Sequence, residues 1–210
     1  SFGFGQGTDH QNLEKPMYQK TDGLVLNHRN FGEADKLISI YTRDFGKISC
    51  IAKGVRKPTS RKSGHLELGS WCNIFVAKGK NIDVLTEAQS KKAFGIENLS
   101  PESANKIYHL LEIVEVLTPV NQKNYKVFAL LVNFLNKIET EEDFNLLSCT
   151  FKVKLLSVLG YFSTTNLKQS SLSSLLGLLE KENFDQIKSQ LSLDQSNYLK
   201  LLAFLDSIIE

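Results

Sequence analysis

The sequence predicts an α+β protein in which a five-stranded β-barrel of the OB type precedes an all-helical domain. Three observations predict this fold. Residues 22–89 show the two-residue alternation of short strands separated by turn signals. From Ser100 onward, apolar residues recur every three or four positions, as they do in amphipathic helices. The 210 residues, 41% of them hydrophobic, suit one or two compact domains with a sizeable core.

Alternation and turn residues define the strands of the barrel. The strands are expected at 24–28, 37–42, 47–53, 71–78 and 82–88. Turn-prone residues separate them, at 30–32, at the tight turn 43–46 and at the hairpin 79–81. Side chains fill the interior of such a small barrel, so it must act through its outer face and its loops.

Positive charge is concentrated in the barrel half. The chain as a whole carries a net charge of +2, but residues 17–98 carry +6 and residues 99–210 carry −3. The segment from 45 to 66 contains no acid, and Gly54, Pro58 and Gly64 predict a loop within it. A basic loop that leaves a strand can follow a phosphate backbone. Either Glu33 or Asp35 can hold this loop in place through a charge-assisted hydrogen bond.

Helical periodicity defines the second half. Ser100 and Pro101 are a typical N-cap and first residue of a helix, and Gly160 is a typical C-cap. The helices are expected at 101–118, 127–138, 144–159, 172–179 and 198–209. We interpret residues 1–16 as an expression leader, 17–95 as the barrel domain and 96–210 as the helical domain.

Several classes of protein are not supported by the sequence. The phosphate-binding P-loop, the GxSxG motif and the HExxH motif are absent. Cys50, Cys72 and Cys149 are too widely spaced for a zinc site and are expected to be buried free thiols. No apolar run approaches the roughly 20 residues that cross a bilayer. We therefore expect a cytoplasmic protein that is not an enzyme and that uses no metal or cofactor.

Cations of the barrel half are the candidate phosphate contacts. They are Arg29, Arg43, Lys47, Lys53, Arg56, Lys57, Arg61, Lys62, Lys78 and Lys80. Arg56 and Arg61 are favoured because a guanidinium can hold a phosphate through two hydrogen bonds. Phe31 and Phe45 lie in predicted turns and are candidate platforms for base stacking, whereas Tyr41 suits either stacking or the barrel core.

Several short motifs in the first half occur in the order and spacing of a known family. They are Gly32-Glu33-Ala34-Asp35, then Thr42-Arg43 with Gly46-Lys47, then Ala52-Lys53-Gly54 with Arg56. Over about 24–90 the chain resembles the N-terminal domain of the bacterial recombination mediator RecO family. Over 100–160 the resemblance rests on helical pattern and on Leu159-Gly160-Tyr161.

This resemblance implies an OB barrel followed by a helical bundle. It implies a protein that binds single- and double-stranded DNA, anneals complementary strands and, with RecR, helps RecA to load onto DNA coated by single-strand binding protein (SSB). The acidic C-terminal tail of SSB would then dock on the helical domain. The family's four-cysteine zinc site is not expected here, because residues 162–166 contain no cysteine. Two other interpretations of the residues remain open: an OB-type factor associated with RNA or ribosomes, and a helical adaptor that does not bind DNA.

Overall fold

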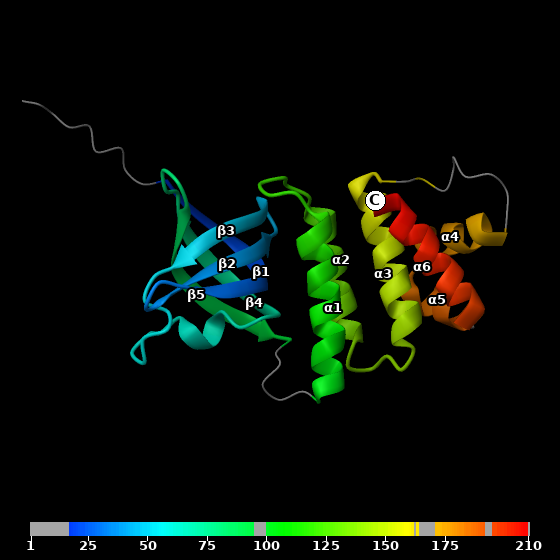
Figure 1. The fold of residues 1–210 in the computed structure, drawn as a ribbon, viewed down its shortest axis with the longest axis horizontal. Coiled ribbons are helices and arrows are strands. Elements are labelled where there is room, and N and C mark those ends of the chain that lie inside the picture. Colours follow the sequence, from blue (N-terminus) through cyan, green and yellow to red (C-terminus); the bar gives the residue numbers. More distant parts are fainter. Residues whose placement is uncertain (1–16, 95–99, 162, 164–170, 192–194, 210) are drawn as a thin grey trace, which may run out of the picture.

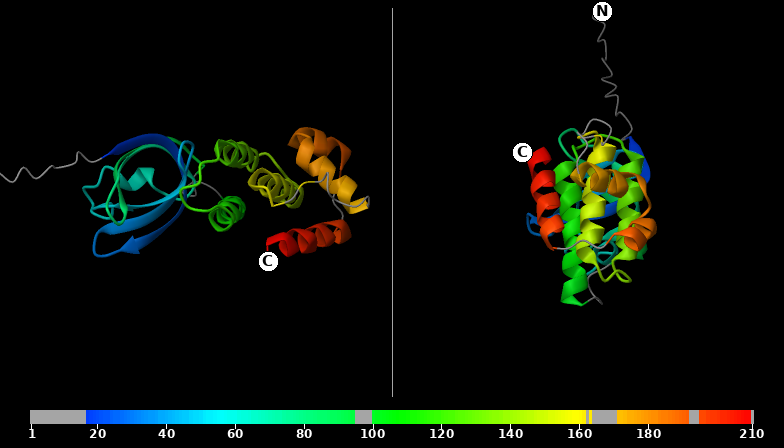
Figure 2. Two further views of the ribbon diagram at one scale, coloured as in Figure 1. Left: turned by 90° about the horizontal axis from the view of Figure 1, so that it is seen from above. Right: turned by 90° about the vertical axis from the view of Figure 1, so that its right-hand side faces the viewer.

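The computed structural model describes residues 17–94, 100–161, 163, 171–191 and 195–209. The expected leader at 1–16, the expected boundary at 95–96 and most of the segment at 162–166 lie outside these residues. A closed barrel lies at one end of the molecule, and helices α1 and α2 pack beside it (Figure 1). Helix α3 forms the next layer, and α4, α5 and α6 cover its far side (Figure 2). The fold class predicted from the sequence is confirmed.

Five strands form the barrel. Their bounds are β1 (Tyr18–Phe31), β2 (Asp35–Thr42), β3 (Gly46–Ala52), β4 (Ser70–Ala77) and β5 (Asp83–Ala93). The strand order is β1-β2-β3-β5-β4, and β4 returns to pair with β1. Only the short pairing of β3 with β5 is parallel. This closed five-stranded arrangement is the OB type, with the short helix η1 (Ser63–His65) between β3 and β4.

Strand β1 is much longer than the expected segment at 24–28. Its first half pairs with β4 and its second half with β2, and a register shift lies between Val25 and Asn27. A strand that serves two neighbours in this way closes the barrel. The turn expected at 30–32 was therefore wrong by two residues, because Phe31 still pairs with Asp35 across the hairpin.

The helices follow the predicted pattern with one addition. Their bounds are α1 (Pro101–Leu117), α2 (Tyr125–Lys137), α3 (Phe144–Leu159), α4 (Ser171–Lys181), α5 (Phe184–Gln190) and α6 (Gln195–Ile209). The Ser100 hydroxyl accepts a hydrogen bond from the amide of Ser103, and Gly160 ends α3 with φ of 82°. Helix α5 was not predicted, because only Phe184 and Ile187 are buried along its seven residues.

Two hydrophobic clusters divide the molecule. The first fills the barrel and includes Ile38, Cys50 and Ile74. The second belongs to the helices but extends onto the barrel exterior, where Leu24 and Tyr41 join it. We call this contact between barrel and helices the domain seam. Apolar burial at the seam fixes the helical domain against one side of the barrel.

The structure tests the expectations about the cysteines and about membrane-spanning segments. All three cysteines are free and buried. Burial raises the pKa of each thiol to about 12. Among the described helices, none combines the length and the apolar character that a membrane span would need.

Candidate nucleic-acid interface

The basic loop, residues 53–62, lies at the end of the barrel farthest from the helices (Figure 1). Hydrogen bonds tie it to the turn between β1 and β2. The Asp35 carboxylate accepts a hydrogen bond of 2.7 Å from the Gly54 amide, and the Arg56 amide donates to Ala34 O at 2.9 Å. The Arg56 guanidinium donates to Gly32 O at 3.3 Å. Asp35 therefore has the holding role that the sequence suggested, and hydrogen bonds join the two loops.

Buried side chains and long-range bonds also anchor the loop to the barrel. Val55 is buried in the barrel core cluster, as is Leu66 just after the loop. Gly54 has φ of 65°, a left-handed conformation that permits the sharp exit from β3. Lys62 Nζ donates to Leu85 O at 3.3 Å on β5. The loop is thus held at both ends, while its middle is free to meet a ligand.

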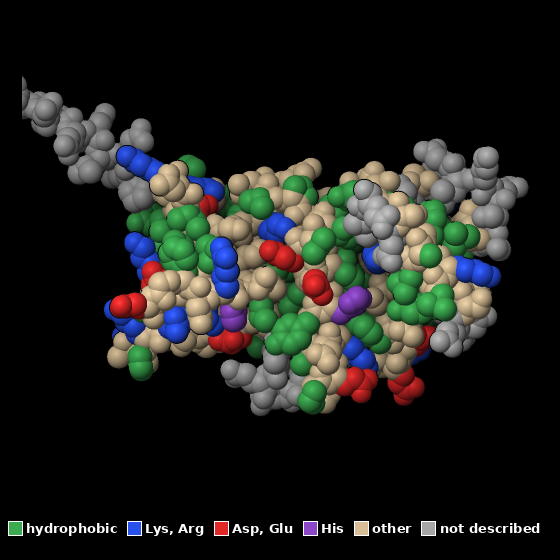
Figure 3. Space-filling model, viewed as in Figure 1, with side chains coloured by type: hydrophobic (Ala, Val, Ile, Leu, Met, Phe, Trp, Pro, Cys, Tyr) green, Lys and Arg blue, Asp and Glu red, His purple; other side chains and the backbone are tan. Residues whose placement is uncertain are grey.

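Five cations follow one another along this loop. They are Lys53, Arg56, Lys57, Arg61 and Lys62. All except the half-buried Lys62 are exposed, and within the part of the chain that the structure describes none forms a salt bridge with a carboxylate. Figure 3 shows Lys and Arg gathered over the barrel. Uncompensated like charges repel one another, so this surface favours a polyanionic ligand.

Outward side chains of β1, β2 and β3 form an open surface beside the basic loop. Ile38 and Cys50 point into the barrel, so the alternate positions point outward. We call this surface the barrel face; it comprises Arg29, Phe31, Leu37, Ser49 and Ile51. Phe31 is 49% exposed, which suits a stacking platform. A shallow hollow of about 110 Å³ lies between the barrel face and Glu115 of α1.

The helical domain covers the other half of the same outer surface. The hydroxyl of Ser39 donates to the Glu115 carboxylate at 2.6 Å. Tyr41 is 1% exposed and donates to Asn124 O at 3.1 Å. Tyr41 therefore belongs neither to the barrel core nor to a stacking surface, because α1 and α2 cover it. The sequence could not show that these helices would pack on this side. Strands 2 and 3 carry the usual OB binding surface, and only its half near the basic loop remains open here.

Arg43 and Lys47, two of the predicted contacts, lie away from the basic loop. Lys47 is buried at the domain seam, and its ammonium donates to Glu115 O. Arg43 lies 3.5 Å from the Asp22 carboxylate and 3.6 Å from that of Asp44. Both were grouped with the loop cations because they follow one another in sequence, whereas the fold separates them by the length of β3 and gives each an internal partner.

A compact ionic network surrounds Arg43. The buried Asp22 carboxylate accepts hydrogen bonds from Lys91, at 2.7 and 2.9 Å, and from Asn73, at 3.0 Å. Burial raises the pKa of Asp22, but the Lys91 and Asn73 hydrogen bonds and the charges of Lys91 and Arg43 outweigh it, so the pKa is lowered overall. This network is structural, because its charges compensate one another.

The remaining predicted residues lie at two further places. Lys78 forms a 2.7 Å ion pair with Asp83, so the positive charge of Lys78 is compensated within the hairpin. Lys80 is exposed at the tip of the same hairpin, and no salt bridge is described for it. Phe45 is half-buried and packs against the barrel core cluster from the turn between β2 and β3. Phe31 therefore offers the better platform of the two predicted phenylalanines.

Sequence reasoning missed a second group of exposed residues. Tyr18 and Lys20 on β1 lie beside Phe75 on β4, where the Lys20 ammonium is 5.0 Å from the Phe75 ring centre. Tyr18 was overlooked because β1 begins six residues before the predicted strand. The alternation of Trp71, Asn73 and Phe75 along β4 was the available signal, since it places these three side chains on one face.

The chain matches two models of known families. Residues 17–94 match the model described as Recombination protein O N terminal, and residues 107–166 match Recombination protein O C terminal. Together these matches cover about two thirds of the chain. The first model covers the barrel, and the second covers most of α1 together with α2 and α3.

Curated relatives carry the name DNA repair protein RecO. The chain is 32% identical over 142 residues to that of Pelotomaculum thermopropionicum, which covers 68% of this chain and 55% of the relative. It is 35% identical over 150 residues to that of Dehalococcoides mccartyi, covering 71% and 59%. The figures for Rubrobacter xylanophilus are 35% over 146 residues, covering 68% and 57%. The matches thus span little more than half the length of these relatives. With both of its parts matched by models and relatives in the same order, the chain belongs to the RecO family of recombination proteins.

Proposed function

We propose that this protein is a DNA-binding mediator of recombinational repair and not an enzyme. It binds single- and double-stranded DNA through the barrel face and the basic loop, and it anneals complementary strands. One observation carries this proposal: five loop cations without carboxylate partners among the described residues lie beside the open half of an OB binding surface. Membership of the RecO family supports the same function.

Annealing follows from charge neutralisation on such a surface. Two strands must approach closely before they pair, and their phosphates repel each other strongly. Cations on an exposed loop screen this repulsion without reading base sequence. Exposed Phe31 can stack on one unpaired base while leaving its hydrogen-bonding edge free. The partner strand can then pair with the bases that are held in this way.

Protein partners belong to the helical domain in this proposal. RecR would act with the protein to load RecA, and the acidic C-terminal tail of SSB would dock on the helices. A groove of about 380 Å³ between α2, α3 and α4 supports a peptide site, since it combines apolar Leu130 with basic Lys126 and Lys154. A neighbouring hollow of about 520 Å³ shares Leu130 and Lys154 and adds Lys137 and Lys181. Glu180, Glu182 and Asp185 also line these hollows, and Lys137 forms an ion pair with Asp185. The apolar floor suits the apolar side chains of a peptide, and the lysines suit its acidic groups.

A salt titration tests the proposal directly. Binding of fluorescent single-stranded DNA is measured by anisotropy between about 50 and 200 mM salt. If about five cations contact phosphates, the logarithmic salt slope should be about −3.5 and affinity should fall roughly a hundredfold. Annealing of complementary strands is followed in parallel by energy transfer between two dyes.

Each rival function predicts a different result. A helical adaptor without a DNA site would show no salt-dependent binding at all, and this outcome would reject the proposal. An RNA-associated OB factor would bind RNA much more tightly than DNA of the same sequence in direct competition. We expect the opposite order or equal affinities, together with annealing of DNA strands at a rate that rises with protein concentration.

A further inference from the structure

We propose that the end of the helical domain at the α1–α2 connection extends the path of single-stranded nucleic acid beyond the barrel. We call this surface the aromatic end; it comprises Phe45, Lys123, Tyr125, Lys126 and Tyr161. The inference rests on the proposed function, and it assigns nucleic-acid contact to a domain whose net charge is negative.

The acids of the helical domain are unevenly distributed. One end of the bundle holds the start of α1 and the connection between α2 and α3, and its acids are Glu102, Glu139, Glu141, Glu142 and Asp143. Figure 3 shows acidic side chains along this lower edge. The sequence contains no acid between Glu115 and Glu139, nor from 144 to 161. The opposite end of the bundle carries Lys123 and Lys126. The acid beside them is Glu180, which lines a groove with Tyr125 and Lys126 and accepts a 2.5 Å hydrogen bond from the Ser157 hydroxyl.

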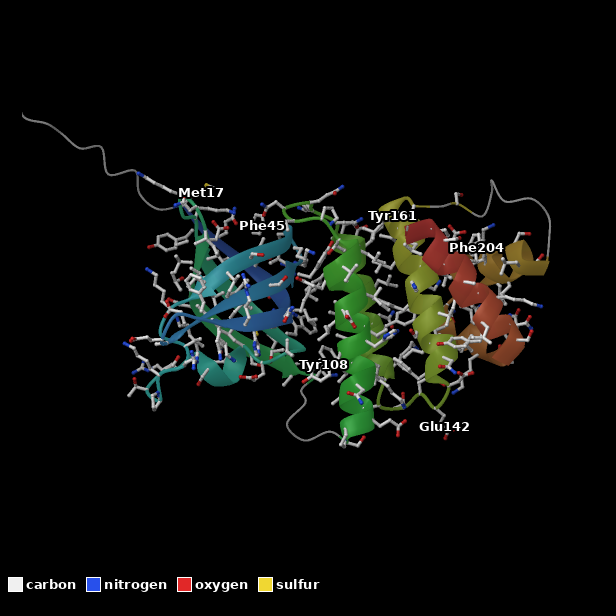
Figure 4. All side chains as sticks on the ribbon, viewed as in Figure 1. Met17, Phe45, Tyr108, Glu142, Tyr161 and Phe204 are labelled. Atoms are coloured by element: carbon white, nitrogen blue, oxygen red, sulfur yellow. The ribbon has the colours of Figure 1, made fainter. Side chains whose placement is uncertain are left out.

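Large aromatic side chains are exposed at this end of the bundle. Tyr125 is 61% exposed and Tyr161 is 49% exposed. Neither tyrosine side chain takes part in a described hydrogen bond that would account for its position. Figure 4 places Phe45 and Tyr161 on the same upper side of the molecule, whereas Tyr108 and Glu142 lie on the lower side. Aromatic rings interleaved with lysines are the usual composition of a single-strand binding path.

A chain of contacts joins the aromatic end to the barrel. The Asn121 amide donates to Lys47 O at 2.7 Å, which fixes the α1–α2 connection beside the turn that carries Phe45. The Asn124 side chain donates to Val158 O at 3.4 Å, three residues before Tyr161. The rings therefore lie on one rigid assembly. Strand β3 leads from this assembly, past exposed Ser49, to Lys53 of the basic loop.

The chemistry of the surface favours a single strand over other ligands. Exposed rings can stack only on unpaired bases, which a duplex does not offer. Lys123 and Lys126 are exposed, and the amino end of α2 adds the positive end of its dipole. Two acids lie near this surface, and both have partners: Asp44 accepts a 2.7 Å hydrogen bond from Thr21 and lies beside Arg43, and Glu180 accepts a hydrogen bond from the Ser157 hydroxyl.

Oligonucleotide length separates this surface from the barrel face. Affinity is measured by anisotropy for oligothymidylates of about 8 nucleotides, the site size of one OB fold, and of about 30 nucleotides. The variants are Tyr125→Ala with Tyr161→Ala, and Lys123→Glu with Lys126→Glu. Matched controls are Tyr108→Ala, an exposed ring on the opposite side, and Lys188→Glu with Lys200→Glu. Circular dichroism checks that each variant is folded.

Affinity of both test variants for the long oligonucleotide should fall at least about tenfold, with short-oligonucleotide affinity within about twofold of the wild type. The controls should bind like the wild type. In addition, 5-iodouridine in the long oligonucleotide should crosslink the wild type at Tyr125 or Tyr161. Normal affinity of the test variants, or crosslinks confined to the barrel face, overturns the inference, while the proposed function stands if basic-loop variants still lose binding. A wild type that binds no oligonucleotide instead rejects the proposed function itself.

Discussion

Two basic segments of the same barrel differ in whether their cations have partners within the protein. The turn from Thr42 to Lys47 and the basic loop at 53–62 both carry cations, and both follow a strand. In the turn, Lys47 is buried against Glu115 O, whereas the Arg43 side chain is 55% exposed and lies 3.5 Å from Asp22 and 3.6 Å from Asp44. In the basic loop, all the cations except half-buried Lys62 are exposed, and none forms a salt bridge among the described residues. Position in the fold, and not residue type, separates the cations with internal partners from the cations that we propose to bind nucleic acid.

The difference teaches how charge should be read in such a barrel. A buried, paired cation stabilises the native state because removing its partner leaves an uncompensated group in a poorly solvated place. An exposed cation contributes little to stability and is free to meet a phosphate. The turn should therefore control folding, and the basic loop should control nucleic-acid affinity. Four experiments can break or sharpen this separation.

The largest effect is expected at Gly46 in the turn. Gly46 has φ of 72°, and a Cβ added there would lie 2.0 Å from Gln122 O in the α1–α2 connection. Gly46→Ala should lower the free energy of unfolding in urea by at least about 3 kcal/mol. Gly54 is the matched control, because its φ is 65° but only the flexible Lys57 side chain lies near. Gly54→Ala should lower the free energy of unfolding by about 1 kcal/mol. Equal losses for both variants would show that close packing of Gly46 against the α1–α2 connection does not contribute to stability.

The next effect concerns the basic loop. Arg56→Glu combined with Arg61→Glu should abolish strand annealing and lower single-strand affinity at least about tenfold in 0.1 M salt, with a salt slope near −2.1 instead of −3.5. Urea unfolding should remain close to that of the wild type. Lys188→Glu with Lys200→Glu makes the same change of charge on the helical domain and should leave annealing intact. A folded double arginine variant that anneals at the normal rate would show that the basic loop is not the binding surface.

A smaller effect is expected at Tyr41, under the helical domain. Tyr41→Phe removes the hydroxyl that donates to Asn124 O and leaves this carbonyl without that partner. The free energy of unfolding should fall by about 1 kcal/mol, while nucleic-acid affinity stays unchanged. Tyr18→Phe, at an exposed position, should change neither quantity. Reduced affinity with unchanged stability in the Tyr41 variant would instead assign its hydroxyl to the binding surface.

The smallest effect should appear only in acid. Interactions with Lys91, Asn73 and Arg43 hold the pKa of Asp22 below its usual value despite burial. A carboxyl whose pKa is lower in the folded state stabilises the protein at pH values above its unfolded-state pKa of about 3.9. This contribution is lost as the pH falls through the folded-state pKa. Stability of the wild type should therefore decline below about pH 4 more steeply than that of Asp22→Asn. Parallel stability curves for the two proteins would show that the network does not favour the charged form.

Much of the fold could be predicted from local pattern. Alternation located β2 to β5 within a few residues, and helical spacing located α1 to α3 together with Gly160 as the end of α3. The errors have physical causes. Strand β1 was predicted too short because its ends are polar and owe their pairing to β2 and β4. Helix α5 was missed because two buried residues give too little periodicity.

The candidate site was only partly predictable. The basic loop followed from composition and from the placement of glycines, and its attachment was expected through either Glu33 or Asp35; the structure shows that Asp35 holds it. The separate fates of Arg43, Lys47 and Lys53 did not, because a strand of seven residues carries neighbours in sequence to opposite ends of the barrel. The exposed rings of Tyr125 and Tyr161 were also hidden, since helical spacing does not show which ends of a bundle stay uncovered.

The sequence by itself determined the two kinds of secondary structure, their order, the core residues and the site of greatest positive charge. Those features depend on periodicity and composition, which act over a few residues. Only the tertiary structure decided which half of the barrel's outer surface stays open and which cations pair with other groups of the protein. That choice depends on the packing of α1 and α2 against β1 and β2, and such long-range contacts follow from the whole shape of the chain.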